Sequence, residues 1–174
     1  MNEWNWRPVG AANRLGKWLQ SRGSLTALIR SRCAEFSVGN VENRLARANR
    51  DEFGFLGLRR GDFALVREVF LCCRGRRVVF AHSVAARSSL RGRWRGLTRL
   101  GAKSLGATVL AGPRVRRESM QFRIVSRRHP LHEKACRYLS CPPEKLWARR
   151  SLFREGRSVI LVTEVFLPGI LELK

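Results

Sequence analysis

The sequence predicts an α+β domain built on an antiparallel sheet of about six strands. Two observations lead to this prediction. Runs of β-branched and aliphatic residues follow one another along the chain, and short turns containing glycine separate several of them. Helical segments are inserted between the runs. A chain of 174 residues has the size of one ordinary domain, so residues 1–174 are predicted to fold as a single unit.

Two helices are predicted at the start of the chain. Within Ala11–Gln20 the apolar residues recur at helical spacing, and Ser24 is a favoured N-cap for a second helix, Leu25–Arg32. The pair is similar to a helix-turn-helix, but the second helix carries arginine only at its far end, at Arg30 and Arg32. A DNA-recognition helix reads bases near its start. The pair is therefore interpreted as structural.

Seven runs of residues are predicted to be strands. They are Cys33–Val38, Val41–Ala48, Phe63–Leu71, Val78–Val84, Arg117–Ser126, Leu146–Phe153 and Ser158–Leu167. The first two are predicted to form a hairpin through Gly39-Asn40, which suits a type I′ or II′ turn. The third and fourth form a hairpin through Arg74-Gly75, and the last two turn around Glu155-Gly156. Leu56–Gly61 is predicted to be a loop.

Two further helices are predicted before Arg117. The first runs from Ser88 or Ser89 to Leu100 and carries arginines at i, i+4 and i+8, a stripe interpreted as a solvated face, with phosphate binding as the alternative. The second is short, capped by Ser104 and starting at Leu105. Free backbone amides at such a start form an anion site, while simple capping is the alternative.

Two charged residues interrupt strand faces that are otherwise apolar. Glu164 lies within Ser158–Leu167, whose alternating faces are both apolar, as in a covered central strand. Arg67 lies, by period-2 alternation, on the apolar face of Phe63–Leu71. A buried charge costs several kcal/mol unless it is paired or used. The two residues therefore indicate a polar pocket inside the sheet domain, with a structural salt bridge between them as the alternative.

The composition limits the other classes of function. A net charge of +22 favours an anionic partner. However, 30 of the 35 basic residues are arginines, and their spread over the whole chain argues against a nucleic-acid partner. A small anionic substrate is consistent with the same charge. The sequence contains no run of 18 apolar residues, so no membrane-spanning helix is predicted. The first ten residues lack an apolar signal core, so a cytoplasmic location is expected.

The cysteines and histidines predict neither a disulfide framework nor a metal centre. Five cysteines, two of them adjacent, are expected to be mostly buried free thiols, as in a reducing compartment. The segment His129–Cys141 contains two histidines and two cysteines, which are zinc-ligand types, but their spacing matches no closed zinc module. Pro130 at a first helical position favours a short amphipathic helix there instead.

Three motifs together resemble the chorismate lyase (chorismate pyruvate-lyase) family. They are REVFL from Arg67, LTRLGAKSLG ending at Gly106, and LWARRSLF…VTEVFLP around Glu164. The resemblance covers residues 23–168 in the same order. It implies a six-stranded antiparallel sheet, helical flaps covering an internal ligand pocket, and no metal or organic cofactor. It also implies a carbon–oxygen lyase that converts chorismate to 4-hydroxybenzoate and pyruvate, the first step of ubiquinone biosynthesis.

The resemblance assigns roles to four residues of this sequence. Arg67 falls on the arginine that binds the ring carboxylate, and Glu164 on the essential carboxylate. Leu25 and Leu105 fall on two flap positions that donate backbone N–H groups. Methionine is usual in the family at the position of Leu25, a mild departure because that contact is mainly through the backbone. The high positive charge and the extended segment His129–Pro143 also depart from the family pattern.

Two other functions remain as alternatives. Related folds serve as effector domains of transcription regulators, so a non-catalytic aromatic-carboxylate sensor is one, although the first 60 residues do not resemble a winged helix. An arginine-rich nucleic-acid-binding protein is the other. Retention of both Arg67 and Glu164 favours the enzyme, which is expected to act as a monomer. The sequence does not separate two roles for Glu164, namely accepting the proton and orienting the ring hydroxyl.

Overall fold

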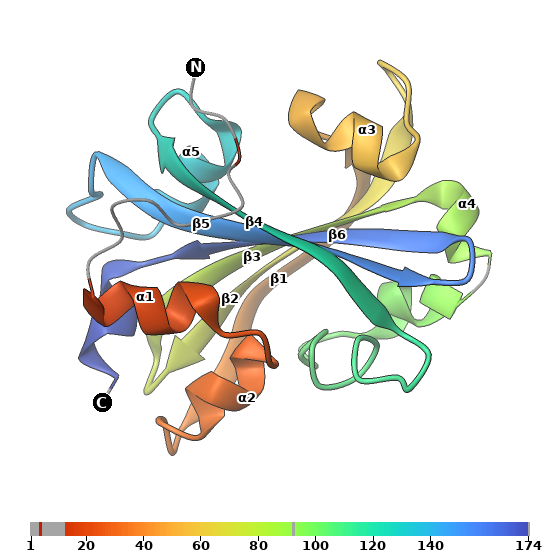
Figure 1. The fold of residues 1–174 in the computed structure, drawn as a ribbon. Coiled ribbons are helices and arrows are strands. Elements are labelled where there is room, and N and C mark those ends of the chain that lie inside the picture. The colour runs from red at the N-terminus through yellow and green to blue at the C-terminus, as the bar shows by residue number, and fades with distance from the viewer. Residues whose placement is uncertain (1–3, 5–12, 92, 174) are drawn as a thin grey trace.

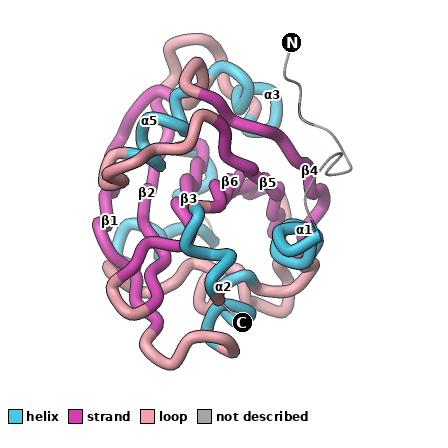
Figure 2. Tube along the Cα trace, turned by 90° about the vertical axis from the view of Figure 1, so that its left-hand side faces the viewer, coloured by secondary structure: helices cyan, strands magenta, loops and turns pink. Residues whose placement is uncertain are grey.

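A computed structural model describes residues 4, 13–91 and 93–173 of the chain. Its centre is one six-stranded antiparallel sheet in the order β1-β2-β3-β6-β5-β4 (Figure 1). Figure 2 shows the sheet curling from β1 round to β4. The α+β class and the six antiparallel strands predicted from the sequence are confirmed. None of the described helices is long and apolar enough to cross a bilayer.

The bounds of the elements follow the hydrophobic runs closely. The strands are β1 (Phe36–Arg47), β2 (Phe63–Cys73), β3 (Arg76–Ala86), β4 (Arg116–Ser126), β5 (Lys145–Glu155) and β6 (Ser158–Phe166). The α-helices are α1 (Asn13–Gln20), α2 (Leu25–Arg30), α3 (Phe53–Leu56), α4 (Arg87–Leu90) and α5 (Pro130–Cys136). Three 3-10 segments are η1 (Arg50–Glu52), η2 (Arg93–Arg99) and η3 (Pro168–Glu172). The predicted helical residues 11 and 12 and most of the N-terminal decapeptide lie outside the described residues.

Helices cover both faces of the sheet. On one face, α1, α2 and η2 pack against β2, β3, β5 and β6 through two apolar clusters that include Trp18, Ile29 and Trp94. On the other face, α3 and α5 pack through two further clusters that include Leu56 and Leu131. The alternation of β6 between these clusters explains why both of its faces are apolar in the sequence. It is a covered central strand, as predicted.

The predicted hairpin within residues 33–48 is wrong. Phe36–Arg47 is one long strand, and both of its halves pair with β2: Val38 lies opposite Leu71, and Glu42 opposite Glu68. Asn40 does adopt a left-handed φ of 48°, but the extra residues form a β-bulge and the chain does not reverse. In contrast, Arg74 and Gly75 have φ values of 48° and 73° and form the predicted tight turn between β2 and β3.

The two helices predicted to start at Ser88 or Ser89 and at Leu105 are also wrong: the first is interrupted and the second does not form. The first is split into the short α4 and the 3-10 segment η2, within which Gly96 lowers helix propensity. At Leu105 a series of turns replaces the second helix. The backbone N–H groups of Thr108 and Leu110 both donate to the Leu105 carbonyl, at 3.3 and 3.0 Å. Glycine and β-branched residues in this segment disfavour a regular helix.

A disulfide between Cys33 and Cys73 overturns the prediction that these cysteines are free thiols. Their Cα atoms lie 5.9 Å apart, and the bond links the chain just after α2 to the last residue of β2. The fold brings together two cysteines that are 40 residues apart in the sequence. Cys72 and Cys136 are buried free thiols, and Cys141 is an exposed one.

Candidate active site

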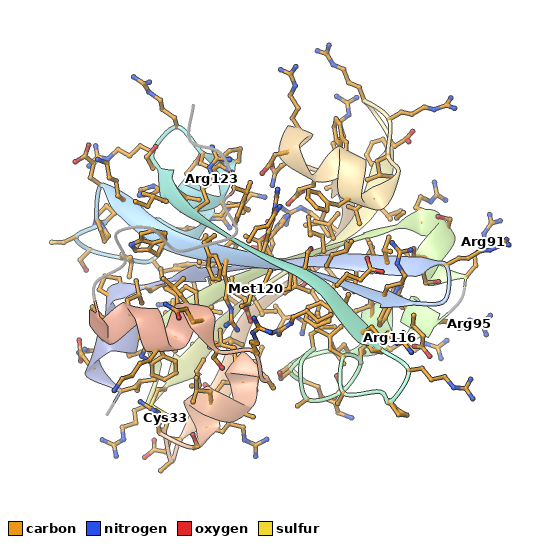
Figure 3. All side chains as sticks on the ribbon, viewed as in Figure 1. Cys33, Arg91, Arg95, Arg116, Met120 and Arg123 are labelled. Carbon is orange, nitrogen blue, oxygen red and sulfur yellow. A yellow bond between two sulfur atoms is a disulfide. The ribbon has the colours of Figure 1, made fainter. Side chains whose placement is uncertain are left out.

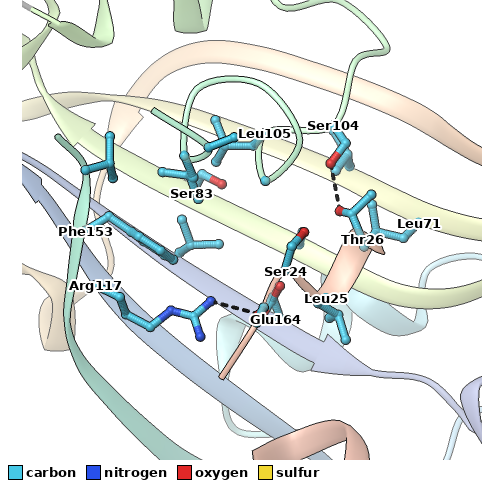
Figure 4. A pocket seen from close by; sticks show the side chains of 18 of the residues that line it. Ser24, Leu25, Thr26, Leu71, Ser83, Ser104, Leu105, Arg117, Phe153 and Glu164 are labelled. Carbon is cyan, nitrogen blue, oxygen red and sulfur yellow. Dashed lines mark hydrogen bonds between the residues drawn. The ribbon is translucent and has the colours of Figure 1, made fainter. Parts of the chain in front are cut away.

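A cavity of about 310 Å³ lies on the face of the sheet that α2 covers (Figure 4). Residues of β2, β3, β5 and β6 form its floor, and residues of the segments 22–26 and 104–111 line it from the other side. We call these segments the first and the second flap. The four residues that the sequence assigned to the site, Leu25, Arg67, Leu105 and Glu164, all line this one cavity.

Arg67 is a buried cation that no carboxylate of the described residues pairs with. Its side chain is on β2 and only 2% of the residue is exposed. One terminal nitrogen donates to the carbonyl oxygens of Gly101 and Lys103, at 2.8 and 3.0 Å, while Nε has no hydrogen-bond acceptor in the described structure. Burial lowers the pKa of this guanidinium. A buried cation held only by neutral groups provides a site for an anion.

Glu164 pairs with an arginine that the sequence analysis did not assign. Arg149 faces it across the β5–β6 pair, and Arg149 Nε donates to Glu164 Oε2 at 2.6 Å. Arg149 is fully buried and also donates to three carbonyl oxygens at the end of α1, those of Trp18, Leu19 and Ser21, at 2.7–3.1 Å. The predicted alternative of a structural Arg67–Glu164 salt bridge is therefore wrong. One carboxylate oxygen of Glu164 is fixed, and the residue still lines the cavity.

Arg117 is a second cation at the cavity that sequence reasoning missed. Its side chain reaches from β4 over the ring of Phe153, with 4.9 Å between the guanidinium carbon and the ring centre. Figure 4 shows the guanidinium pointing toward Glu164. Burial lowers the pKa of Arg117, and the charge of Glu164 partly offsets this. In the sequence it is one of many arginines, and only the fold separates it from its exposed neighbour Arg116.

The two flaps contact each other above the cavity. Thr26 Oγ1 and Ser104 Oγ share a hydrogen bond of 2.7 Å, drawn in Figure 4. A Cβ added to Gly106 would lie 3.2 Å from Ser24 Oγ, so glycine allows this close approach. Ser24 is the predicted N-cap of α2, and its Oγ accepts from the backbone N–H of Ala27. Leu25 is the first residue of α2, a position whose N–H has no partner within the helix.

The remaining candidate groups lie away from the cavity. Among the residues that the structure describes, no three histidine, cysteine or acidic side chains are grouped as metal ligands would be. His132 Nε2 lies 2.8 Å from the Pro143 carbonyl oxygen, and His129 caps α5 by accepting from the N–H of Leu131. Arg91 and Arg95 are exposed at the edge of the molecule (Figure 3), which agrees with the predicted solvated stripe.

Comparison with known proteins identifies the family. Residues 9–173 match the model of a protein family described as "Chorismate lyase". The chain belongs to the chorismate lyase family. A relative from Nitrosospira multiformis, named as a probable chorismate pyruvate-lyase, is 51% identical over 99% of this chain and 97% of its own length. A relative of the same name from Nitrosomonas europaea is 49% identical over 98% of this chain and 96% of its own length.

Solved structures of lower identity share the fold. The C-terminal domain of PhnF aligns with a TM-score of 0.59 and 18% identity, over 87% of this chain and 93% of that one. A GntR-family transcriptional regulator from Enterococcus faecalis aligns with a TM-score of 0.53 and 13% identity, over 76% of this chain and 89% of that one. At this identity the likeness concerns only the architecture, which this chain shares with these structures.

Proposed function

We propose that this protein is a chorismate lyase, a carbon–oxygen lyase that eliminates pyruvate from chorismate to give 4-hydroxybenzoate. The observation that carries the proposal is that one cavity is lined by both Arg67 and Glu164. Arg67 is a buried cation without a carboxylate partner in the described structure, and Glu164 is a carboxylate that Arg149 fixes. Membership of the chorismate lyase family and the names of relatives 45–51% identical support the same reaction.

In this proposal the cavity binds chorismate by its two ends. The guanidinium of Arg67 binds the ring carboxylate through charge-assisted hydrogen bonds. The backbone N–H groups of Leu25 and Leu105, one from each flap, donate to anionic oxygens of the ligand. Arg67 is on β2 and Glu164 is on β6, two strand intervals away, so their backbones are separated by roughly 10 Å across the sheet. The side chains reach inward from there toward opposite ends of a single aromatic ring.

Glu164 acts at the hydroxyl end of the ring. The ether bond to the enolpyruvyl group breaks while the ring carbon that bears the hydroxyl loses its proton, and the ring becomes aromatic. Because Arg149 holds Oε2, Oε1 of Glu164 is left to contact the ring hydroxyl, to receive that proton, or to do both. The protein otherwise positions the reactive conformer and excludes water under the flaps. The chemistry assigned to these residues needs no metal or organic cofactor.

The cellular setting is part of the proposal. We expect a cytoplasmic monomer that supplies 4-hydroxybenzoate to ubiquinone biosynthesis, with a small-molecule substrate and no nucleic-acid partner. The spread of arginine over the whole chain, rather than in one basic tail, supports the last point. Light scattering after size exclusion checks the oligomeric state. A gel shift at moderate salt checks nucleic-acid binding, which would fall steeply with salt if it were present.

The test is to incubate the purified protein with chorismate and to follow 4-hydroxybenzoate by absorbance and pyruvate by a coupled assay. We expect the two products in equal amounts. Binding of 4-hydroxybenzoate without turnover would instead indicate a sensor, the function suggested by the architecture shared with regulators. Absence of both turnover and binding would reject the assignment of the cavity.

Glu164→Gln is expected to lower kcat by about 100-fold or more, because positioned acid–base groups typically contribute 10²–10⁴-fold. Glu118→Gln is the matched control, since Glu118 is an exposed acid on β4 paired with Arg154. Turnover of Glu164→Gln at the wild-type rate would refute the role of this carboxylate.

A further inference from the structure

The cavity contains one more cation than the product needs. Arg67 and Arg117 line it from strands far apart in the sheet order, β2 and β4. The exposed Arg22 and the carboxylate of Glu164, which Arg149 holds, also line it. Chorismate carries two carboxylates, one on the ring and one on the enolpyruvyl group, whereas 4-hydroxybenzoate carries only one. Because Arg149 balances the charge of Glu164, the guanidinium groups of Arg67 and Arg117 match the two carboxylates of the substrate and exceed the one of the aromatic product.

Arg117 is held by neutral hydrogen-bond acceptors, and no carboxylate of the described residues forms an ion pair with it. One terminal nitrogen donates to the carbonyl of Arg22 at 2.7 Å and the other to that of Gly23 at 3.4 Å. The guanidinium stacks over Phe153, which forms part of the wall of the cavity. These partners are neutral, and they occupy at most two of the five N–H donors. The other N–H groups have no hydrogen-bond acceptor among the described residues, so they can donate to a ligand.

The order of the strands places Arg117 at the correct end for the second carboxylate. Arg67 is on β2, Glu164 is on β6 and Arg117 is on β4, so the glutamate lies between the two arginines across the sheet. With the ring carboxylate at Arg67 and the ring hydroxyl at Glu164, the ether oxygen is on the carbon next to the one that bears the hydroxyl. The enolpyruvyl group thus extends from the Glu164 end, on which the guanidinium of Arg117 converges (Figure 4).

We propose that Arg117 binds the enolpyruvyl carboxylate of chorismate and thereby distinguishes the substrate from the aromatic product. This inference rests on the proposed function and adds a specificity residue to it. Arg67 contacts a carboxylate that persists through the reaction. Arg117 contacts a carboxylate that departs with pyruvate. Once the ether bond is broken, the aromatic product is therefore bound by Arg67 alone of the two arginines.

The test separates the affinity for substrate from the affinity for product. Arg117→Gln is compared with the wild type in kcat/KM for chorismate and in the dissociation constant of 4-hydroxybenzoate from calorimetry. We expect kcat/KM to fall about 10- to 100-fold, the usual effect of removing a hydrogen bond to a charged group. The affinity for 4-hydroxybenzoate should change less than about threefold. Arg116→Gln is the matched control, because it removes the same charge from an exposed neighbour.

A dianionic probe checks the contact directly. 3-(Carboxymethoxy)-4-hydroxybenzoate carries a second carboxylate on the ether position of the ring. It should bind the wild type more tightly than 3-methoxy-4-hydroxybenzoate does, and this advantage should disappear in Arg117→Gln and be partly retained in Arg117→Lys, which keeps the charge without the planar fork.

Two results would overturn the inference. If Arg117 only anchors the first flap through the Arg22 carbonyl, Arg117→Gln will weaken chorismate and 4-hydroxybenzoate by the same factor, and the probe will keep its advantage. Unchanged kcat/KM would overturn it as well. A wild type that does not convert chorismate would refute the proposed function itself, whereas the role of Arg117 is decided by the difference between variant and wild type.

Discussion

The two faces of the sheet both bury charged side chains, but the charges are arranged differently. On β2, the neighbours Arg67 and Glu68 point to opposite faces, and both are nearly inaccessible to solvent. Arg67 faces the cavity and donates only to carbonyl oxygens. Glu68 faces the other side, where Lys134 Nζ lies 2.6 Å and a terminal nitrogen of Arg44 lies 2.8 Å from its oxygens.

His82 completes the charge cluster on the far face. Its ring nitrogens lie 2.8 Å from Glu68 and 3.1 Å from Glu52, and none of the three side chains lines the cavity. Burial alone would lower the pKa of His82, but the two carboxylates outweigh it and raise the pKa to about 9. For Glu68 burial alone would raise the pKa, but the hydrogen bonds and charges of His82 and Lys134 outweigh it and lower the pKa to about 2.

The neighbours Arg149 and Arg150 repeat this division on β5. Arg149 fixes Glu164 beside the cavity. On the opposite face Arg150 lies 3.2 Å from Asp51 and stacks over the ring of Phe55 at 4.4 Å. Burial of a charge is thus no guide to function in this fold. The charges of the site are those that line the cavity: Arg67 has no carboxylate partner among the described residues, and Glu164 has only one oxygen held by Arg149. The paired charges away from the cavity stabilise the fold.

Removing a carboxylate from the far face should affect stability and leave the chemistry intact. Glu68→Gln is expected to lower the free energy of unfolding by about 3–5 kcal/mol, because it removes one of the two carboxylates that pair with the buried His82 and the partner of the half-buried Lys134 and Arg44. Since Glu68 does not line the cavity, kcat of the folded protein should remain at the wild-type value. Urea unfolding and chorismate turnover measure the two quantities. A loss of kcat without a loss of stability would contradict the division between the faces.

The pH dependence of stability should come from the same cluster. The folded-state pKa of His82, about 9, exceeds its usual 6.5, so its contribution is complete below pH 6.5 and is lost as the pH rises through 9. The pKa difference of about 2.5 corresponds to roughly 3 kcal/mol. Urea titrations between pH 6 and 10 should show this decline in the wild type and its absence in His82→Gln. Parallel curves for the two proteins would rule out a charged His82.

A smaller effect is expected at the contact between the flaps. Thr26→Val removes the hydrogen bond to Ser104 and should favour opening by about 1 kcal/mol, or about fivefold in the release rate of 4-hydroxybenzoate. If release limits turnover, kcat rises with it. Thr26→Ser keeps the hydroxyl and is the control, while Ser104→Ala should reproduce the effect. Stopped-flow release rates that are equal for Val and Ser at position 26 would exclude a closing role for this bond.

The sequence was sufficient where a local rule fixes the outcome. Period-2 alternation placed Arg67 and Glu164 on apolar faces, and their common cavity follows from strands that belong to one sheet. Ser24 met the requirement for an N-cap, and Arg74-Gly75 that of a two-residue turn. The roles of Leu25 and Leu105, in contrast, came from the family resemblance and stay predictions.

The sequence was insufficient where pairing between distant segments decides. Arg149 meets Glu164 only through the register of β5 and β6, and neither residue type nor spacing signals it among 30 arginines. Cys33 and Cys73 meet because the segment after α2 lies beside the end of β2. Asn40 suits a hairpin turn and a β-bulge equally, and pairing with β2 determines which one forms.

The comparison of the two faces is tested most directly at Arg67. Arg67→Met should weaken the binding of 4-hydroxybenzoate by about 100-fold, because it removes the charge that binds the ring carboxylate. It should change the free energy of unfolding by less than about 1 kcal/mol, since relief of an unpaired buried charge offsets two lost hydrogen bonds. Arg150→Met is the matched variant: it should lower the free energy of unfolding and leave the binding of 4-hydroxybenzoate unchanged. Calorimetry and urea unfolding of both variants measure these two quantities. The account is contradicted if Arg67→Met binds 4-hydroxybenzoate as the wild type does and its free energy of unfolding is several kcal/mol lower.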